Sequence, residues 1–114
     1  MAKAIDLTLE REVQRRVIEL YEGVGCVVKR TSGGRSNGTR NAPGLPDLIV
    51  FPPERRVQNG MVGMFFHETK RPGGKQSPAQ IEWQQLCDSR LIEYVVGGTE
   101  AAIRFLKSIG LLAA

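Results

Sequence analysis

Hydrophobic and polar positions recur along this chain with two periods, and each change of period marks an expected element. In residues 8–22 the apolar side chains recur every three or four positions, which predicts an amphipathic helix. Thr8 is placed to cap this helix, and Gly23 and Gly25 end it. The β-branched run at 26–31 then predicts a short strand.

Two apolar runs in the middle of the chain predict a hairpin. Residues 47–51 form one strand, which two prolines end, and residues 62–70 form the other. The pair Asn59-Gly60 between them is a strong turn signal. The segment 32–44, ahead of the first strand, is rich in glycine, serine and asparagine, and we expect it to be an exposed loop.

Helix signals return at residues 77–90. Ser77 is placed at the cap, Pro78 takes the first helical position, and Gln80 completes a capping box. Residues 91–96 predict a further strand. Taken alone, the capping box accounts for Gln80 without any role in catalysis.

After this strand, Thr99 is placed to cap a last amphipathic helix. The expected order is therefore α-β-β-β-α-β-α, which predicts a small α/β or α+β domain with a mixed sheet flanked by helices. The 114 residues suffice for a single core and are too few for two, so we expect one domain over 1–114.

Charge and composition narrow the class of protein. The net charge of +4 favours a polyanionic partner. The sequence has neither an apolar run long enough to span a membrane nor the apolar core of a signal peptide, and we expect an intracellular protein without a membrane partner. Cys26 and Cys87 lack metal or redox spacing and are expected to be buried, reduced thiols.

Three charged residues, Asp47, Glu68 and Lys70, interrupt the most apolar stretches. A hairpin register that pairs Ile49 with Phe66 sets Asp47 opposite Glu68 on one face, and strand alternation brings Lys70 to that face. Two adjacent carboxylates repel unless a proton or a hard cation neutralises them, and oxygen ligands suit magnesium or manganese. A divalent-metal site is the simplest resolution.

The first helix offers a third acid. Glu10 borders its apolar stripe, whereas Glu12 faces water. The helix dipole alone also favours an acid in a first turn, so a purely structural role for Glu10 stays open. Ile18 lies opposite the stripe, and an exposed apolar residue there would favour a dimer contact.

Basic residues flank the acids. They fall into two groups, Lys29, Arg30, Arg35 and Arg40 ahead of Asp47, and Arg71 and Lys75 after Glu68. We expect them to follow a phosphate backbone without reading bases, although a solubilising loop is the alternative.

The acids and their neighbours resemble a known nuclease core. Pro46-Asp47 followed by Glu68-Thr69-Lys70 is similar to the PD-(D/E)xK pattern. The fuller pattern resembles the VRR-NUC family, the virus-type replication-repair nucleases, over about residues 8–109. It adds Glu10 and Gln14 in the first helix, GLPD, ETKRPGG and the run Ser77-Pro78-Ala79-Gln80. The chain departs from that pattern where His67 and Thr69 flank Glu68, because the family usually has apolar residues there.

The resemblance implies a restriction-endonuclease-like fold and cleavage of DNA with Mg²⁺ or Mn²⁺. It implies metal binding by Glu10, Asp47, Glu68 and the backbone carbonyl of Thr69, and catalysis by Asp47, Glu68, Lys70 and Gln80. Lys70 would orient or activate the attacking water. Free-standing members of this length imply a homodimer that acts on branched DNA, such as four-way junctions, in the cytoplasm of a bacterial or phage-infected cell. Two alternatives stay open: a non-catalytic nucleic-acid-binding module, and a nuclease that acts on RNA.

Overall fold

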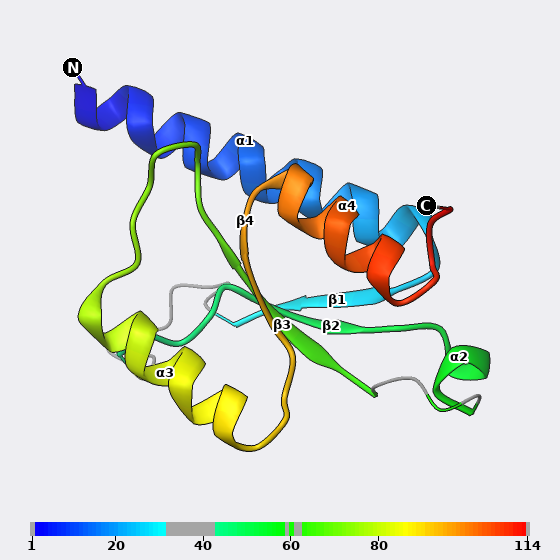
Figure 1. Ribbon diagram of the computed structural model, residues 1–114. Coiled ribbons are helices and arrows are strands. Elements are labelled where there is room, and N and C mark those ends of the chain that lie inside the picture. The colour runs from blue at the N-terminus through cyan, green and yellow to red at the C-terminus, as the bar shows by residue number, and fades with distance from the viewer. Residues whose placement is uncertain (1, 32–42, 59, 61–62, 114) are drawn as a thin grey trace.

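The computed structural model describes residues 2–31, 43–58, 60 and 63–113. The elements run in chain order as α1 (Ala2–Gly23), β1 (Val27–Arg30), β2 (Leu48–Phe51), α2 (Glu54–Gln58), β3 (Phe65–Thr69), α3 (Pro78–Ser89), β4 (Tyr94–Gly97) and α4 (Thr99–Ser108) (Figure 1). Within these ranges no helix has both the length and the apolar character that a membrane crossing requires. The expected order is confirmed, with the short helix α2 added between two strands.

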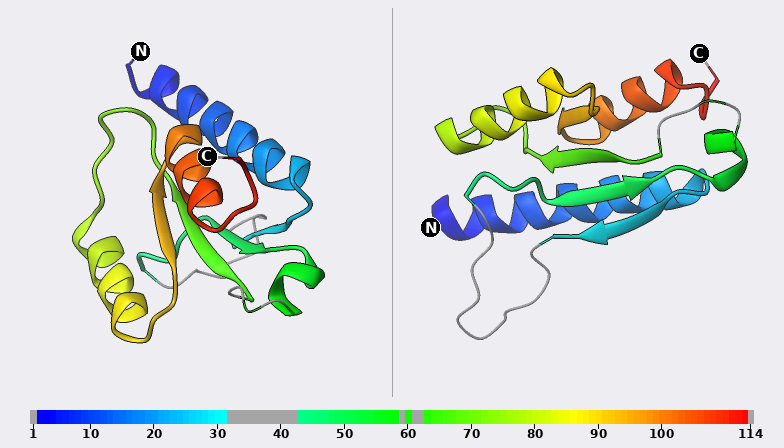
Figure 2. Two further views of the ribbon diagram at one scale, coloured as in Figure 1. Left: turned by 45° about the vertical axis from the view of Figure 1, so that its right-hand side comes forward. Right: turned by 90° about the horizontal axis from the view of Figure 1, so that it is seen from below.

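The four strands form one mixed sheet in the order β1-β2-β3-β4. Strand β2 is antiparallel to both of its neighbours, β1 and β3, whereas β4 runs parallel to β3. Helices α1 and α4 pack side by side on one face, and α3 lies on the other (Figure 1). Figure 2 shows that the N-terminal end of α1 projects beyond the sheet. The mixed α/β fold class predicted from the sequence is therefore confirmed.

The register between β2 and β3 is the one expected. Ile49 pairs with Phe66, and Leu48 pairs with His67. One position further in this register, Asp47 stands opposite Glu68. The apolar alternation of the two strands excludes a slip by one residue, because that slip would turn every buried side chain to the other face.

The core lies between the sheet and the layer of α1 and α4. Its buried members are Val17, Tyr21, Cys26, Leu48, Val50, Phe65, Val95, Ala102 and Leu106. Cys26 and Cys87 are both buried and free, as expected. Ile18 also packs against this core, so its expected exposure is wrong. The physical reason is that α1 contacts β1 and β3 as well as α4, so its buried face is wider than the apolar stripe.

Two helix starts differ from the sequence prediction. Helix α1 begins at Ala2 and runs through Thr8, because alanine and leucine residues ahead of the threonine favour helix. Helix α4 has Gly98 at its N-cap without a side-chain cap, and Thr99 is its first residue. There a glycine turn from β4 starts the helix in place of a threonine cap.

At the two ends of α3, the predicted start is confirmed and the predicted strand after its end begins later than expected. Ser77 Oγ accepts from the Gln80 N–H at 3.2 Å, and Gln80 Oε1 accepts from the Ser77 N–H at 2.8 Å, so the capping box is confirmed. The next strand begins at Tyr94 instead of residue 91, because Leu91 turns with a positive φ of 58°. The N–H of Ile92 still donates to Cys87 at the end of the helix. The turn after α3 therefore delays the strand.

The predicted loop and turn are described only in part. Of the loop at 32–44, residues 32–42 lie outside the described ranges. The same holds for Asn59 of the expected turn. Helix α2 lies in the connection that this turn was expected to close, and the Arg56 N–H donates to the Pro53 carbonyl at its start.

Candidate active site

Backbone contacts position Asp47 just before β2. The Thr31 N–H donates to the Asp47 carbonyl at 2.9 Å, which ties the segment to the end of β1. The Asp47 carboxylate accepts from the Thr69 N–H at 2.8 Å through Oδ2. Asp47 is thus fixed against the end of β3, beside Glu68.

A glycine allows this segment to reach α3. Gly44 has a φ of 79°, and a Cβ added there would lie 2.3 Å from the carbonyl oxygen of Ala79. Any larger residue would therefore collide with the backbone of the first helical turn. The GLPD segment depends on this close approach for its path into β2.

Electrostatics at Asp47 favour a positive partner. Burial raises the pKa of its carboxyl, and the Thr69 hydrogen bond opposes this rise. The negative charges of Glu68 and Glu10 raise the pKa further, whereas Lys70 lowers it. Ionised Asp47 therefore lies where more positive charge would stabilise it.

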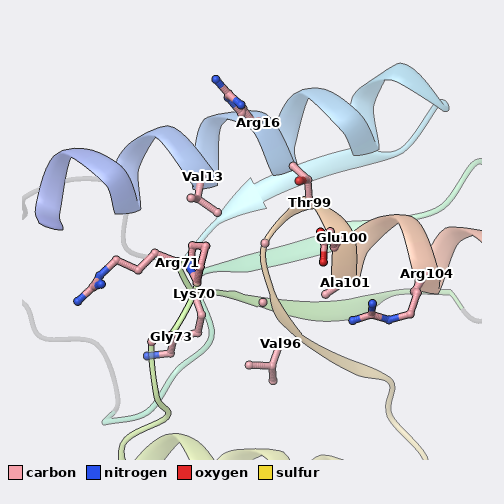
Figure 3. A pocket seen from close by; sticks show the side chains of 14 residues that line it. Val13, Arg16, Lys70, Arg71, Gly73, Val96, Thr99, Glu100, Ala101 and Arg104 are labelled. Atoms are coloured by element: carbon pink, nitrogen blue, oxygen red, sulfur yellow. The ribbon is translucent and has the colours of Figure 1, made fainter.

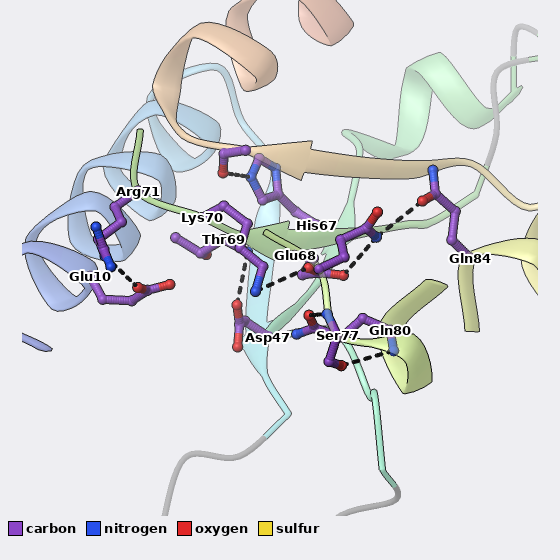
Figure 4. Close-up of polar contacts among 12 residues, drawn as sticks. Glu10, Asp47, His67, Glu68, Thr69, Lys70, Arg71, Ser77, Gln80 and Gln84 are labelled. Atoms are coloured by element: carbon purple, nitrogen blue, oxygen red, sulfur yellow. Dashed lines mark hydrogen bonds and ion pairs between the residues drawn. The ribbon is translucent and has the colours of Figure 1, made fainter. Parts of the chain in front are cut away.

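Glu68 is fully buried, and its two oxygens have different environments (Figure 4). Oε1 accepts from the Tyr94 hydroxyl at 2.7 Å and from Gln76 Nε2 at 3.3 Å. Oε2 is buried without a hydrogen-bond partner among the described residues. The protein thus holds one oxygen in place and leaves the other without a donor.

Lys70 follows β3 directly and lies on the Glu68 face, as the alternation predicted. Its ammonium Nζ is 3.6 Å from Glu68 Oε2, and its side chain is 18% exposed. Its backbone N–H donates to the Gly97 carbonyl of β4 at 3.1 Å. The side chain therefore leaves an anchored backbone and reaches the oxygen that lacks a hydrogen bond.

Two contacts to Glu68 were not foreseen from the sequence. Gln76, from the segment ahead of α3, also donates to Gln84 Oε1 at 3.0 Å, so it links Glu68 to that helix. The sequence offered one indication of Gln76, namely that it is a polar residue directly before the helix cap Ser77. Tyr94 reaches Glu68 because β4 pairs with β3, and no local pattern specifies that pairing.

Gln80 occupies a different position from these two residues. Its side chain closes the capping box with Ser77. The glutamine that contacts Glu68 is instead Gln76. A catalytic role for Gln80 stays a prediction.

Glu10 does not join the other two acids. Within the described ranges no three His, Cys, Asp or Glu side chains come together as a metal-binding group. Glu10 Oε1 instead lies 3.9 Å from Arg71 Nε, and its side chain is 39% exposed (Figure 4). The expected three-acid cluster is absent because Arg71, leaving the end of β3, offers Glu10 a positive charge at the rim of the sheet.

The acids that remain still fit a divalent cation. Asp47 and Glu68 supply hard carboxylate oxygens, and Glu68 Oε2 is a buried anionic atom without a hydrogen bond. Magnesium and manganese prefer such ligands. A site of three acids would require Glu10 to leave Arg71.

The structure describes four of the six predicted DNA-binding residues. Lys29 and Arg30 are exposed on β1, and Lys29 pairs with Ile49, on the same face as Phe66 and Glu68. Lys75 is exposed in the segment after β3. Arg71 pairs with Glu10. Arg35 and Arg40 lie outside the described residues.

Lys70 also lines a pocket of about 530 Å³ (Figure 3). The pocket lies between α1, residues 70–74 and the turn from β4 into α4. Its charged lining residues are Arg16, Lys70, Arg71, Arg104 and Glu100. Cations therefore outnumber acids in the pocket wall.

The cations of the pocket differ in their partners. Arg16 is bound to Glu12 at 3.1 Å and lies on the outer side of α1 (Figure 3). Arg104 extends from α4, and within the described ranges no ion pair to it is formed. Arg104 is therefore the cation best placed to meet a bound anion.

The fold and the site together define a PD-(D/E)xK-like nuclease core. The sheet is mixed with helices on both faces, an aspartate precedes one strand, and Glu-x-Lys ends the next. Among solved structures, the chain is similar to a VRR_NUC domain, with a TM-score of 0.62 and 25% sequence identity. The match covers 86% of this chain and 94% of that chain. It supports assignment to the VRR-NUC family and a nuclease domain, as the motifs indicated. No protein-family model and no curated protein matches the sequence.

Proposed function

We propose that this domain is a metal-dependent endonuclease that hydrolyses phosphodiester bonds in DNA. The observation that carries the proposal is the Oε2 atom of Glu68, which is buried without a hydrogen bond beside Lys70. A fully buried carboxylate that the protein satisfies on one oxygen alone is costly unless a further cation binds. The nuclease-type fold around it gives that cation a use.

Asp47 and Glu68 would hold Mg²⁺ or Mn²⁺, with the Thr69 backbone carbonyl as a further ligand. When bound, the cation lowers the pKa of water and stabilises negative charge on a phosphate. Lys70 would hold the attacking water and stabilise the charge that develops on the phosphate oxygens. Tyr94 and Gln76 would keep Glu68 oriented by occupying its other oxygen.

DNA would bind through phosphate contacts. Lys29, Arg30 and Lys75 are exposed, and the pocket beside Lys70 has a positive wall. Such contacts give affinity that depends on salt and not on base sequence. Selectivity would then come from DNA shape, which suits a branched substrate such as a four-way junction. By the family resemblance, the active form would be a homodimer in the cytoplasm of a bacterial or phage-infected cell.

The decisive experiment compares a labelled four-way junction with a linear duplex of matched sequence. Each is incubated at one defined salt concentration with Mg²⁺, Mn²⁺ or EDTA, and light scattering gives the mass of the protein. We expect metal-dependent product, more from the junction, and the mass of a dimer.

Each part of the proposal can fail separately. Equal cleavage of both DNAs would reject the branched substrate, and a monomer mass would reject the dimer. Binding that persists in EDTA, with no product under any metal, would favour a non-catalytic module. Cleavage of a matched RNA in preference to DNA would reassign the substrate.

A further inference from the structure

His67 is a buried polar side chain that the proposed reaction leaves without a role. It is fully buried on the face of β3 opposite Glu68, in the layer of α1 and α4. Both ring nitrogens have partners. Nδ1 lies 2.6 Å from the Tyr21 hydroxyl of α1, and Nε2 lies 2.9 Å from the Gly97 carbonyl of β4.

These partners fix the tautomer of His67. A carbonyl oxygen only accepts hydrogen bonds, so Nε2 carries the proton and donates to Gly97. Nδ1 is then the acceptor, and the Tyr21 hydroxyl donates to it. Each of the two buried groups thus donates one proton, the Nε2–H of His67 to Gly97 and the hydroxyl of Tyr21 to Nδ1.

The Gly97 carbonyl also accepts from the backbone N–H of Lys70, at 3.1 Å. The Gly97 backbone has a φ of 134°, and an added Cβ would lie 3.0 Å from that of Ala101. Only glycine suits this turn, and glycine is also the residue whose backbone is least restrained by itself. The His67 hydrogen bond therefore restrains a flexible point to which Lys70 is attached.

We propose that His67, oriented by Tyr21, is a positioning residue that fixes the Gly97 carbonyl and, through it, the backbone from which Lys70 reaches Glu68. The inference rests on the proposed function, in which Lys70 acts on the reacting groups. It also gives a use to the departure from the VRR-NUC pattern at this position. A polar connection from α1 to the Lys70 backbone stands where an apolar residue was expected.

An apolar residue in place of His67 would disturb both partners. The Tyr21 hydroxyl would lose its acceptor in a buried site, and Gly97 would keep only the Lys70 donor. Neither residue touches the acids directly, so Asp47 and Glu68 would retain their own contacts. The expected effect is a displaced Lys70 and not a lost site.

The test uses His67→Leu and the conservative His67→Gln, whose amide can still donate to Gly97. We expect His67→Leu to lower kcat about ten- to a hundredfold with KM for DNA unchanged, because a small misplacement of a catalytic group has effects of that size. His67→Gln should recover most of the rate. In a Lys70→Ala background, His67→Leu should lower the residual rate no further, since the two changes act through one group.

Amide hydrogen exchange provides a readout that needs no cleavage. The Lys70 amide should exchange faster in His67→Leu, while the amide of Phe66, which donates to Glu93, should not change. Val50→Ala serves as the control, since it removes buried apolar contacts without touching Gly97. If His67→Leu does not fold, Tyr21→Phe removes only the hydroxyl and tests the same chain of contacts.

Additive losses of rate in the double variant would overturn the inference, as would unchanged exchange at Lys70. A loss of kcat in Val50→Ala equal to that in His67→Leu would also overturn it, because the effect would then reflect general loss of packing. These outcomes can be told apart from failure of the proposed function, which would show in the wild-type protein. In that case the wild-type protein itself would yield no product, and the inference would fall with it.

Discussion

The Lys70 ammonium lies 3.6 Å from the one oxygen of Glu68 that accepts no hydrogen bond within the described structure. The other oxygen accepts from Tyr94 and Gln76. Glu68 is fully buried, so this ion pair is weakly screened by water. A single ammonium balances the charge of one carboxylate, whereas Asp47 and Glu68 carry two negative charges when both are ionised. The site as built is therefore short of positive charge.

Lys70→Ala should reduce DNA cleavage to a small residual rate while DNA binding persists. In the proposed function the ammonium would act on the reacting groups, and the exposed basic residues would supply most of the affinity for DNA. We expect a loss of about a hundredfold or more in kcat, the scale of removing one stabilising group. Product formation and fluorescence anisotropy measure the two effects. Lys107→Ala, which removes the same charge from the exposed side of α4, is the matched control, and normal cleavage by Lys70→Ala would contradict the assignment.

Tyr94→Phe should weaken metal binding through Glu68. The variant removes the hydroxyl that donates to Oε1 and keeps the ring, whose centroid is 6.2 Å from that of Phe66. Loss of such an outer contact typically weakens metal affinity about ten- to a hundredfold. Titration calorimetry with Mn²⁺ measures the change. Glu68→Gln should weaken binding more, and equal Mn²⁺ affinity in Tyr94→Phe and wild type would show that the hydroxyl does not orient the ligand.

The sequence predicted what short-range patterns determine. The hairpin register assumed from the sequence, with Ile49 opposite Phe66, is confirmed, and Ser77, Pro78 and Gln80 predicted the start of α3. Tyr94 was missed because its contact to Glu68 depends on the parallel pairing of β4, a long-range choice. Glu10 was expected beside the other acids because helical periodicity gives its face and not its competing partner. Only the folded chain shows that Glu10 pairs with Arg71 at the rim of the sheet.

Arg104→Ala should weaken DNA binding in a manner that depends on salt. If the pocket beside Lys70 receives a phosphate, removal of this cation should lower the slope of log affinity against log salt by about one. Lys107→Ala removes a charge from the same helix outside the pocket and should leave the slope unchanged. Anisotropy titrations over a range of salt give both slopes. Identical slopes for the two variants would exclude a phosphate contact in this pocket.

The protein should become less stable as the pH is lowered through the range in which His67 titrates. Burial lowers its pKa from 6.5 to about 4, so below pH 6.5 the unfolded chain binds a proton that the folded chain excludes. The free energy of unfolding therefore decreases as pH falls from about 6.5 to 4, by roughly 3 kcal/mol in all. Asp47 has the opposite sign, because its raised pKa lets the folded state bind a proton more readily.

The comparison with His67→Leu separates the histidine from Asp47 and the other carboxyls. Urea unfolding of both proteins at pH 7 and pH 4.5, in EDTA, gives four free energies. The variant should start less stable at pH 7, because Tyr21 and Gly97 lose a partner, and should lose less on acidification because it lacks the buried imidazole. The difference between the two proteins should therefore narrow toward pH 4.5. A difference that stays constant would mean that the ring titrates alike in the folded and unfolded states, which is incompatible with a neutral imidazole held between Tyr21 and Gly97.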